Sequence, residues 1–282
     1  MQFHRAPIAH VSHVDLKVTD LQRATAFYKQ ILGFQVLNQE ASTAQLTADG
    51  ETALLTLHAL DQPSEKSRRT AGLYHFAILL PTRSDLADFI KHISAQNVPI
   101  GASDHLVSES IYFSDPDGNG IEVYADRDPS EWNWQNGQVD MAVDPIDAAD
   151  ILKHATDSGW QGLPAKTIMG HIHLHVADLQ ETKRFYTEGL GMEIVCRLGD
   201  QALFIADGHY HHHIGINIWN GVGAPPSADD SPGLKFYTIQ LNSDEQKQSV
   251  LKQLEGIRAD VTEENGETIA TDPSGNRIRL VV

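Results

Sequence analysis

The sequence repeats itself, and this repetition limits the folds that the chain can adopt. Seven of the 15 positions from Asp20 to Phe34 recur, identical, at a shift of 158 residues. A second match, at a shift of 157, aligns Asp115-Pro116-Asp117-Gly118-Asn119 with Asp272-Pro273-Ser274-Gly275-Asn276. Because two separate stretches recur at nearly the same spacing, the chain contains a duplicated unit, and its 282 residues suit two such halves.

Each half divides again into two smaller modules. In the first module, residues 13–18 alternate as a strand does, Asp20 is placed to cap a helix, and Gly33 stands where a helix ends. Short strands are predicted over 44–46 and 53–57. In the second module we predict a strand over 73–80, a helix over 84–96, and strands over 110–113 and 120–124 on either side of an Asp-Pro-Asp-Gly turn.

These modules predict an α+β chain built from four β-α-β-β-β units in two tandem domains. The N-terminal domain spans 1–131, with modules at about 8–62 and 70–127. The C-terminal domain spans 167–282, with modules at about 167–222 and 232–282. The stretch 132–166 fits neither pattern, so we assign it as a linker with a helix near 146–157.

Composition excludes several classes of function. The net charge of −17 disfavours nucleic acid and anionic membrane surfaces as partners. No apolar run approaches the roughly 18 residues that span a bilayer, and the first ten residues lack a signal core. Cys196 is the only cysteine, so no disulfide framework exists. We therefore expect a cytoplasmic protein, with a symmetric homo-oligomer as the general expectation for such chains.

Three strings within the predicted strands carry a family resemblance. They are Asp-Pro-Asp-Gly-Asn-Gly-Ile-Glu over 115–122, Gly-Leu-Tyr-His-Phe-Ala-Ile-Leu-Leu over 72–80 and Gly-His-Ile-His-Leu-His-Val over 170–176. Together with the module order, they resemble the vicinal-oxygen-chelate superfamily, which includes glyoxalases, bleomycin-resistance proteins and type I extradiol dioxygenases, and are most similar to catechol 2,3-dioxygenases. The resemblance covers nearly the whole chain outside the linker. It implies curved mixed sheets with helices outside and a metal in the mouth of a sheet.

In that family the metal ligands come from the first strand of each paired module and from a last strand. The first-strand positions here hold His13, His75, His171 and Phe236, and the last-strand positions hold Glu122 and Arg279. Phenylalanine cannot bind a metal and arginine repels one, so the fourth module has lost its ligands. The resemblance therefore implies His75 and Glu122 as ligands. Pairing of modules two and three adds His171, and pairing of modules one and two adds His13.

The third module favours His171 as the third ligand. In type I extradiol enzymes the third module carries an acid–base histidine within a His-His-x-apolar string, and His212 matches that position. A tyrosine ten residues before the carboxylate ligand also belongs to that family's site, and Tyr112 stands ten residues before Glu122. Modules one and two offer no counterpart of His212. The other histidines of the third module, at 173, 175, 211 and 213, are left without an assigned role.

Two histidines and one carboxylate on one face of a metal suit non-haem Fe(II), with Mn(II) or Zn(II) as alternatives. The resemblance thus implies an extradiol ring-cleaving dioxygenase that acts on a small aromatic diol with O2. In that reaction His212 exchanges protons with substrate and Tyr112 binds a substrate oxygen. A glyoxalase-like metal-dependent lyase or isomerase is the enzymatic alternative. A small-molecule-binding protein of the resistance type is the non-catalytic alternative.

Overall fold

The computed structural model describes residues 2–67 and 69–282 and contains the four predicted modules. Module one comprises β1 (His10–Val18), α1 (Leu21–Phe27) continued by a π-helical turn (Tyr28–Leu32), β2 (Gln35–Gln39), β3 (Thr43–Thr47) and β4 (Ala53–Ala59). Module two comprises β5 (Gly72–Leu79), α2 (Arg83–Ser94), β6 (Gly101–Asp104), β7 (Ser108–Ser114) and β8 (Gly120–Asp126).

The second half has the same order of elements. Module three comprises β11 (Ile168–His175), α4 (Leu179–Arg184) continued by a π-helical turn (Phe185–Gly189), β12 (Glu193–Leu198), β13 (Ala202–Ala206) and β14 (Ile214–Asn217). Module four comprises β15 (Gly233–Gln240), α5 (Asp244–Gly256), β16 (Asp260–Glu264), β17 (Glu267–Thr271) and β18 (Arg277–Val281). The α+β fold of four such modules is therefore confirmed.

The helix caps give the alignment between modules. In every module an Asp, Thr or Ser side chain accepts a backbone N–H at the start of the helix; the caps are Asp20, Thr82, Asp178 and Ser243. Counting seven residues back from these caps (20 − 7, 82 − 7, 178 − 7, 243 − 7) reaches His13, His75, His171 and Phe236. The four predicted first-strand ligand positions are thus structurally equivalent.

Strand pairing joins modules from different halves of the chain. One eight-stranded sheet has the order β16-β17-β18-β15-β1-β4-β3-β2, and the other has the order β12-β13-β14-β11-β5-β8-β7-β6. Within them β1 runs antiparallel to β15, and β5 runs antiparallel to β11. Modules two and three therefore share a sheet, as the sequence favoured, and modules one and four share the other. The domain boundaries of the two halves stay a prediction.

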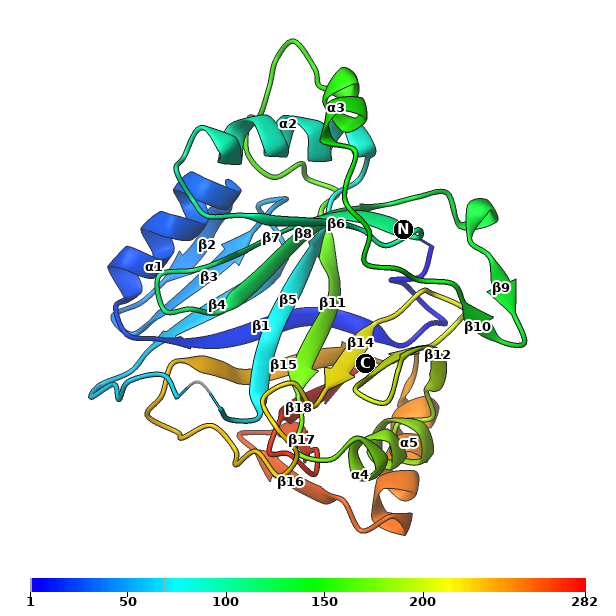
Figure 1. Ribbon diagram of the computed structural model, residues 1–282. Helices are drawn as coiled ribbons and strands as arrows, with labels where there is room; N and C mark the ends of the chain where they lie inside the picture. The colour runs from blue at the N-terminus through cyan, green and yellow to red at the C-terminus, as the bar shows by residue number, and fades with distance from the viewer. Residues whose placement is uncertain (1, 68) are drawn as a thin grey trace.

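Alternation along the strands separates the core from the functional face. On β1, Val14, Leu16 and Val18 are fully buried, and the side chains between them point to the opposite face. Their apolar face joins Phe76 of β5 and Ile172 of β11 in one continuous hydrophobic cluster. Figure 1 shows β1 crossing β5 and β11, with α1 and α2 on one side of the molecule and α4 and α5 on another. The opposite, more polar faces of the two sheets do not belong to this cluster, and they carry the candidate functional side chains.

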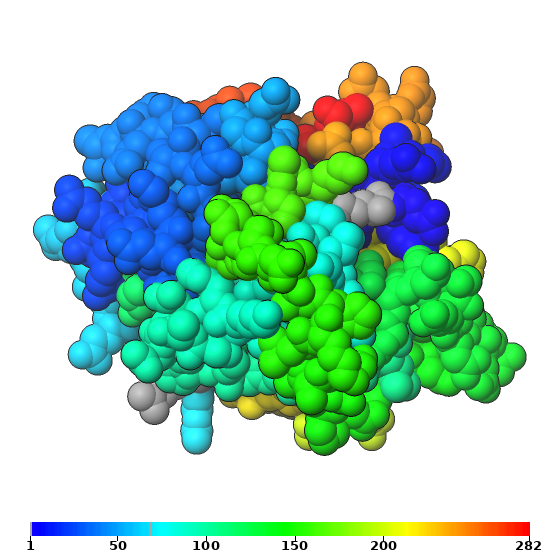
Figure 2. All heavy atoms as spheres, turned by 90° about the horizontal axis from the view of Figure 1, so that it is seen from above, coloured from blue at the N-terminus to red at the C-terminus, as the bar shows by residue number. Residues whose placement is uncertain are grey.

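The linker is more irregular than predicted. A short 3₁₀ turn (Pro129–Glu131) precedes it. The linker itself holds a hairpin of β9 (Trp134–Gln135) and β10 (Gln138–Val139), and α3 (Ala148–Ile151) followed by a 3₁₀ turn (Leu152–His154). The predicted helix over 146–157 was thus too long. It stops early because the Thr156 N–H donates to the Asp88 side chain of α2 instead of to the helix. Arg83 of α2 also pairs with Asp150, and in Figure 2 the linker lies directly against α2. Among the described residues, no helix has the length and hydropathy of a membrane span.

Candidate metal centre

Three neighbouring strands bring the predicted ligands to one row across a sheet. On β5, Ala77 stands beside Glu122 of the parallel strand β8 and beside His171 of the antiparallel strand β11. Residues in register across strands point to the same face, and so does His75, two residues before Ala77. The small side chain of Ala77 leaves space above it, so that Glu122, His75 and His171 meet there.

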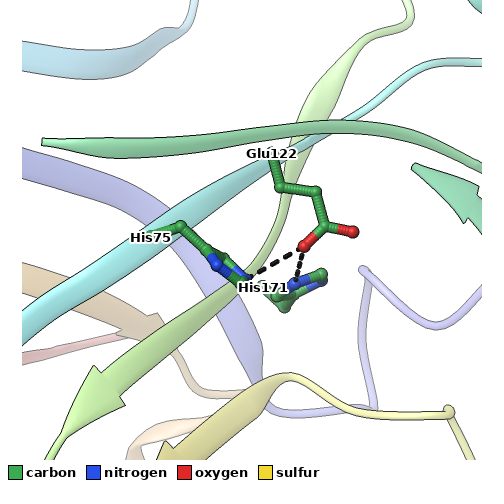
Figure 3. A group of neighbouring side chains, drawn as sticks. All are labelled: His75, Glu122 and His171. Carbon is green, nitrogen blue, oxygen red and sulfur yellow. Dashed lines mark hydrogen bonds and ion pairs between the residues drawn. The ribbon is translucent and has the colours of Figure 1, made fainter. Parts of the chain in front are cut away.

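The three side chains converge on one point (Figure 3). The Nε2 atoms of His75 and His171 each lie 3.0 Å from the same oxygen, Oε2 of Glu122. All three side chains are buried, and together they form a group whose ligand atoms lie within 4.8 Å of one another. Nε2 of His75 is buried yet lacks a hydrogen bond of acceptable geometry. Two imidazole nitrogens and a carboxylate oxygen aimed at one place fit a divalent transition metal.

The protonation states also suit metal binding. Complete burial alone would raise the pKa of Glu122, but the neighbouring imidazoles of His171 and His75 hold that pKa well below its usual range. Burial lowers the pKa of His171 to about 4, against the opposing charge of Glu122. At neutral pH the cluster therefore contains a carboxylate and a neutral His171, which are the ligand forms. Ser110 on β7 donates to Oε1 of Glu122 over 2.6 Å and fixes the carboxylate.

His212 lies beside the cluster, and a chain of hydrogen bonds defines its tautomer. Its ring centroid is 4.1 Å from that of His171. Nε2 of His211 lies 2.8 Å from a carboxylate oxygen of Asp126, so it carries the proton that it donates there. Nδ1 of His211 must then accept from Nδ1 of His212, 2.8 Å away. Nε2 of neutral His212 is left with a free lone pair, and burial lowers the pKa of this residue well below its ordinary value.

Tyr112 also lies at the cluster, with a defined hydroxyl orientation. It stands opposite Glu122 in the β7–β8 pair, and its ring centroid is 5.5 Å from that of His75. Nδ1 of His105 donates to the carbonyl of Ala142, which makes Nε2 of His105 the acceptor for the Tyr112 hydroxyl. Burial and the charge of Glu122 raise the pKa of Tyr112 well above its usual value. The neutral phenol therefore has lone pairs free for another hydrogen-bond donor.

β14, the last strand of module three, brings no carboxylate to the cluster. In module two, Glu122 pairs with Ala77, which stands two residues after the ligand position His75. In module three, Gly215 pairs with His173, which stands two residues after His171, so Gly215 is the equivalent of Glu122. A Cβ at Gly215 would lie 2.8 Å from Cγ of His173, because the His173 ring covers this position. Nε2 of His173 accepts from the Asn217 amide over 3.0 Å. The candidate ligand groups brought together here are thus those of His75, Glu122 and His171.

His13 lies in the other sheet, away from the cluster. Its nitrogens bond to the carbonyl of Ala53 and the hydroxyl of Thr56. At the position equivalent to Glu122, Arg279 stacks on Phe236 with its guanidinium carbon 4.0 Å from the ring centroid. The guanidinium also lies 3.8 Å from Asp15. The guanidinium cation of Arg279 therefore stands where a metal ligand would stand in the sheet of modules one and four, as expected for the fourth module, which has lost its ligands.

Sequence reasoning missed several residues around the cluster. Ser110 binds Glu122 and stands two residues before Tyr112 on β7. Asp126 binds His211 and stands four residues after Glu122 on β8. Because side chains alternate along a strand, these even spacings would have indicated that both residues face the site. Tyr74 also lies against His75, with ring centroids 4.9 Å apart, because of an irregularity in β5 that no sequence pattern indicated.

This fold and this three-residue cluster define a class of metal-dependent proteins, and comparison with known families agrees. Residues 10–123 and 168–280 match the Glyoxalase/Bleomycin resistance protein/Dioxygenase superfamily, and the chain belongs to it. More particularly, it is 42% identical to a Catechol-2,3-dioxygenase of Bacillus subtilis over 279 residues, which are 97% of each chain. The chain is thus an enzyme of the catechol-2,3-dioxygenase-like group.

More distant relatives agree on the family and the fold. A Biphenyl-2,3-diol 1,2-dioxygenase of Rhodococcus globerulus is 30% identical over 120 residues, covering 42% of this chain and 63% of that protein. The crystal structure of glyoxalase I from Zea mays has a TM-score of 0.58 at 16% identity, covering 97% of this chain and 92% of that one. At that identity the likeness shows the fold alone.

Proposed function

We propose that the chain is a non-haem Fe(II)-dependent extradiol dioxygenase that cleaves the ring of a catechol-type diol with O2. The observation that carries this proposal is the convergence of His75, Glu122 and His171 on one buried point. Mn(II) or Zn(II) are the alternative ions for the same donor set. The similarity to the Bacillus subtilis enzyme supports the choice of reaction.

In this proposal the side chains around the cluster prepare the substrate. A metal held by His75, Glu122 and His171 would supply Lewis-acid and redox chemistry for the reaction of the diol with O2. Nε2 of His212 accepts a proton from a substrate hydroxyl and later returns it to the ring-opened product. The Tyr112 hydroxyl accepts a hydrogen bond from the substrate, since its own proton points to His105. Burial of the cluster excludes water from the reacting atoms.

Two observations argue against the alternative functions. Glyoxalase-like sites usually use a further carboxylate from the last strand of the partner module, and Gly215, covered by His173, occupies that place here. A binding protein without chemistry needs no group of two imidazole nitrogens and one carboxylate oxygen converging on one buried point, which is the donor set of a divalent transition metal. We further propose a cytoplasmic enzyme whose partners are a small aromatic diol and O2. Because most oligomers of soluble proteins are symmetric homo-oligomers, we propose separately that the chain forms one.

The first experiment is anaerobic reconstitution with Fe(II), followed by catechol and oxygen, with the yellow ring-opened product recorded by absorbance. We expect wild type to form the product and His75→Ala and His171→Ala to lose more than about 100-fold in rate, because each change removes a ligand. His13→Ala is the matched control and keeps its rate, since His13 lies in the other sheet. Metal-loaded wild type without product would favour a lyase or isomerase, and protein that binds no metal would favour the binder.

A further inference from the structure

A groove next to the metal centre offers more room than a bare catechol needs. Its volume is about 900 Å³, and its lining includes His75 and Tyr112 of the candidate site together with Tyr74. Small-molecule pockets span about 300–1,000 Å³, so this groove lies near the upper limit. Its far wall comes from the sheet of modules one and four, through residues such as Leu234. A substituent on the substrate ring therefore has a path out of the metal centre.

Tyr74 forms the border between this groove and the metal centre. The β5–β11 pairing shifts between His75–His173 and Leu73–Leu174, which leaves Tyr74 in a bulge without a partner. A bulge turns two consecutive side chains to one face, so Tyr74 lies against His75 and also against His173, with a centroid distance of 5.1 Å. The neighbouring strand accommodates the bulge only with glycine, because a Cβ at Gly120 would lie 2.0 Å from the Tyr74 carbonyl oxygen.

Trp219 precedes Asn220, which lines the groove, and its ring packs against that of Tyr74. Its ring meets that of Tyr74 edge to face, with centroids 5.2 Å apart and planes at 85°. Its backbone N–H donates to the Asn217 side chain, whose amide group holds His173. Tyr74 is 40% exposed and Trp219 is 42% exposed, although both are large aromatic residues. We call these two residues the aromatic rim.

We propose that the aromatic rim is the specificity-determining wall for the ring substituent, and that the enzyme prefers aromatic diols with an apolar substituent. This inference rests on the proposed dioxygenase function. Exposed aromatic surface at the edge of a buried site is characteristic of ligand contact, and aromatic rings pack well on apolar groups. The rim is attached through Asn217 and the β5 bulge to the strands that carry the ligands, so a group packed on it is aligned with the metal centre.

The same groove contains lysines that would favour an anionic substituent instead. Their ammonium groups already have partners within the chain. Lys17 donates to the carbonyls of Ala228 and Asp229, Lys66 donates to the carbonyl of Gly118, and Lys235 lies 3.1 Å from Nδ1 of His58. The rim, by contrast, has exposed surface without such a structural use. The apolar substituent is therefore the better match, and the anionic one is an outcome of the test.

The test compares catechol, tert-butylcatechol and dihydroxyphenylacetate as substrates of the iron-loaded full chain. We expect wild type to have the lowest KM for tert-butylcatechol. Tyr74→Ala and Trp219→Ala should raise that KM about tenfold, the scale of a lost aromatic contact, with kcat nearly unchanged and a much smaller effect on catechol. Tyr74→Phe should restore the wild-type KM, because the ring is kept. Leu198→Ala, at a residue that is 42% exposed on β12, is the control for loss of exposed apolar surface and should change nothing.

Several results would overturn the inference. A lowest KM for dihydroxyphenylacetate would assign selection to the lysines, and equal losses for all three substrates would reduce Tyr74 and Trp219 to a structural role. Turnover of none of the three would contradict the proposed function itself. In that case calorimetric titration of tert-butylcatechol into wild type and Trp219→Ala still decides the inference: equal affinities refute the wall, and about tenfold weaker binding by the variant supports it.

Discussion

At the scale of single residues, the position of one proton determines what His212 can do. Asp126 fixes the tautomer of His211, and His211 in turn fixes that of His212, so the lone pair of His212 is at Nε2. The Nδ1 atoms of the two histidines are joined, and Nε2 makes no hydrogen bond to any residue in the part of the chain that the structure describes. A base with this orientation is prepared before substrate arrives.

His212→Phe should therefore lower kcat by about 100-fold or more, the usual contribution of a positioned general base. Metal content should stay at the wild-type level, because phenylalanine fills the space of the ring beside His171 and no ligand atom is lost. Rate and iron stoichiometry are measured on the same preparation. His209→Phe, an exposed position on the same histidine-rich segment, is the control and keeps full rate. Loss of the metal in His212→Phe would show instead that His212 is itself a ligand.

At the scale of elements, β14 approaches β11 closely at Gly215, where no side chain stands between Gly215 and the His173 ring. Gly215→Ala should destabilise the protein by about 1–3 kcal/mol, the cost of overpacking, because the new Cβ meets His173 at 2.8 Å and the ring has no free space. Chemical denaturation of the metal-free protein measures this change. Gly101→Ala on β6 is the matched control, since its Cβ would make an ordinary 3.7 Å contact with Tyr112. Equal stabilities of the two variants would contradict this account of the β11–β14 contact.

The elements also show which features a sequence can predict. Module order and helix bounds were predictable because they depend on local periodicity and on residue types such as Asp20 and Gly33, whose φ of 78° is the left-handed value of a helix end. The first-strand ligand positions came from the family resemblance together with the internal repeat. Pairing of modules depends on contacts between residues far apart in sequence, and only the surviving ligands indicated it. The bulge at Tyr74 and the short linker helix depend on neighbouring strands and on Asp88, so no local pattern could predict them.

At the scale of the whole molecule, the many buried histidines make stability depend on pH. His4 packs against Tyr210 and His213 and donates to the carbonyl of Gly170. Burial lowers its pKa from the usual 6.5 to about 3, and burial lowers the pKa of His213 well below the usual value too. The folded state thus keeps these imidazoles neutral where the unfolded chain protonates them. The stability is fully present above pH 6.5 and is lost progressively as pH falls toward the folded-state pKa.

We therefore expect the free energy of unfolding of the metal-free protein to fall between pH 6.5 and about 3, with His4 alone contributing up to about 1.4 kcal/mol per pH unit. His4→Phe should lower stability at neutral pH, because the bond to Gly170 is lost, but it should flatten the acid slope by that amount. Denaturant titrations at a series of pH values measure both effects. His154→Gln, at an exposed position, is the control and keeps the wild-type slope. An unchanged slope in His4→Phe would mean that the N-terminal segment detaches before His4 titrates, and the acid sensitivity would then belong to the histidines of the sheet.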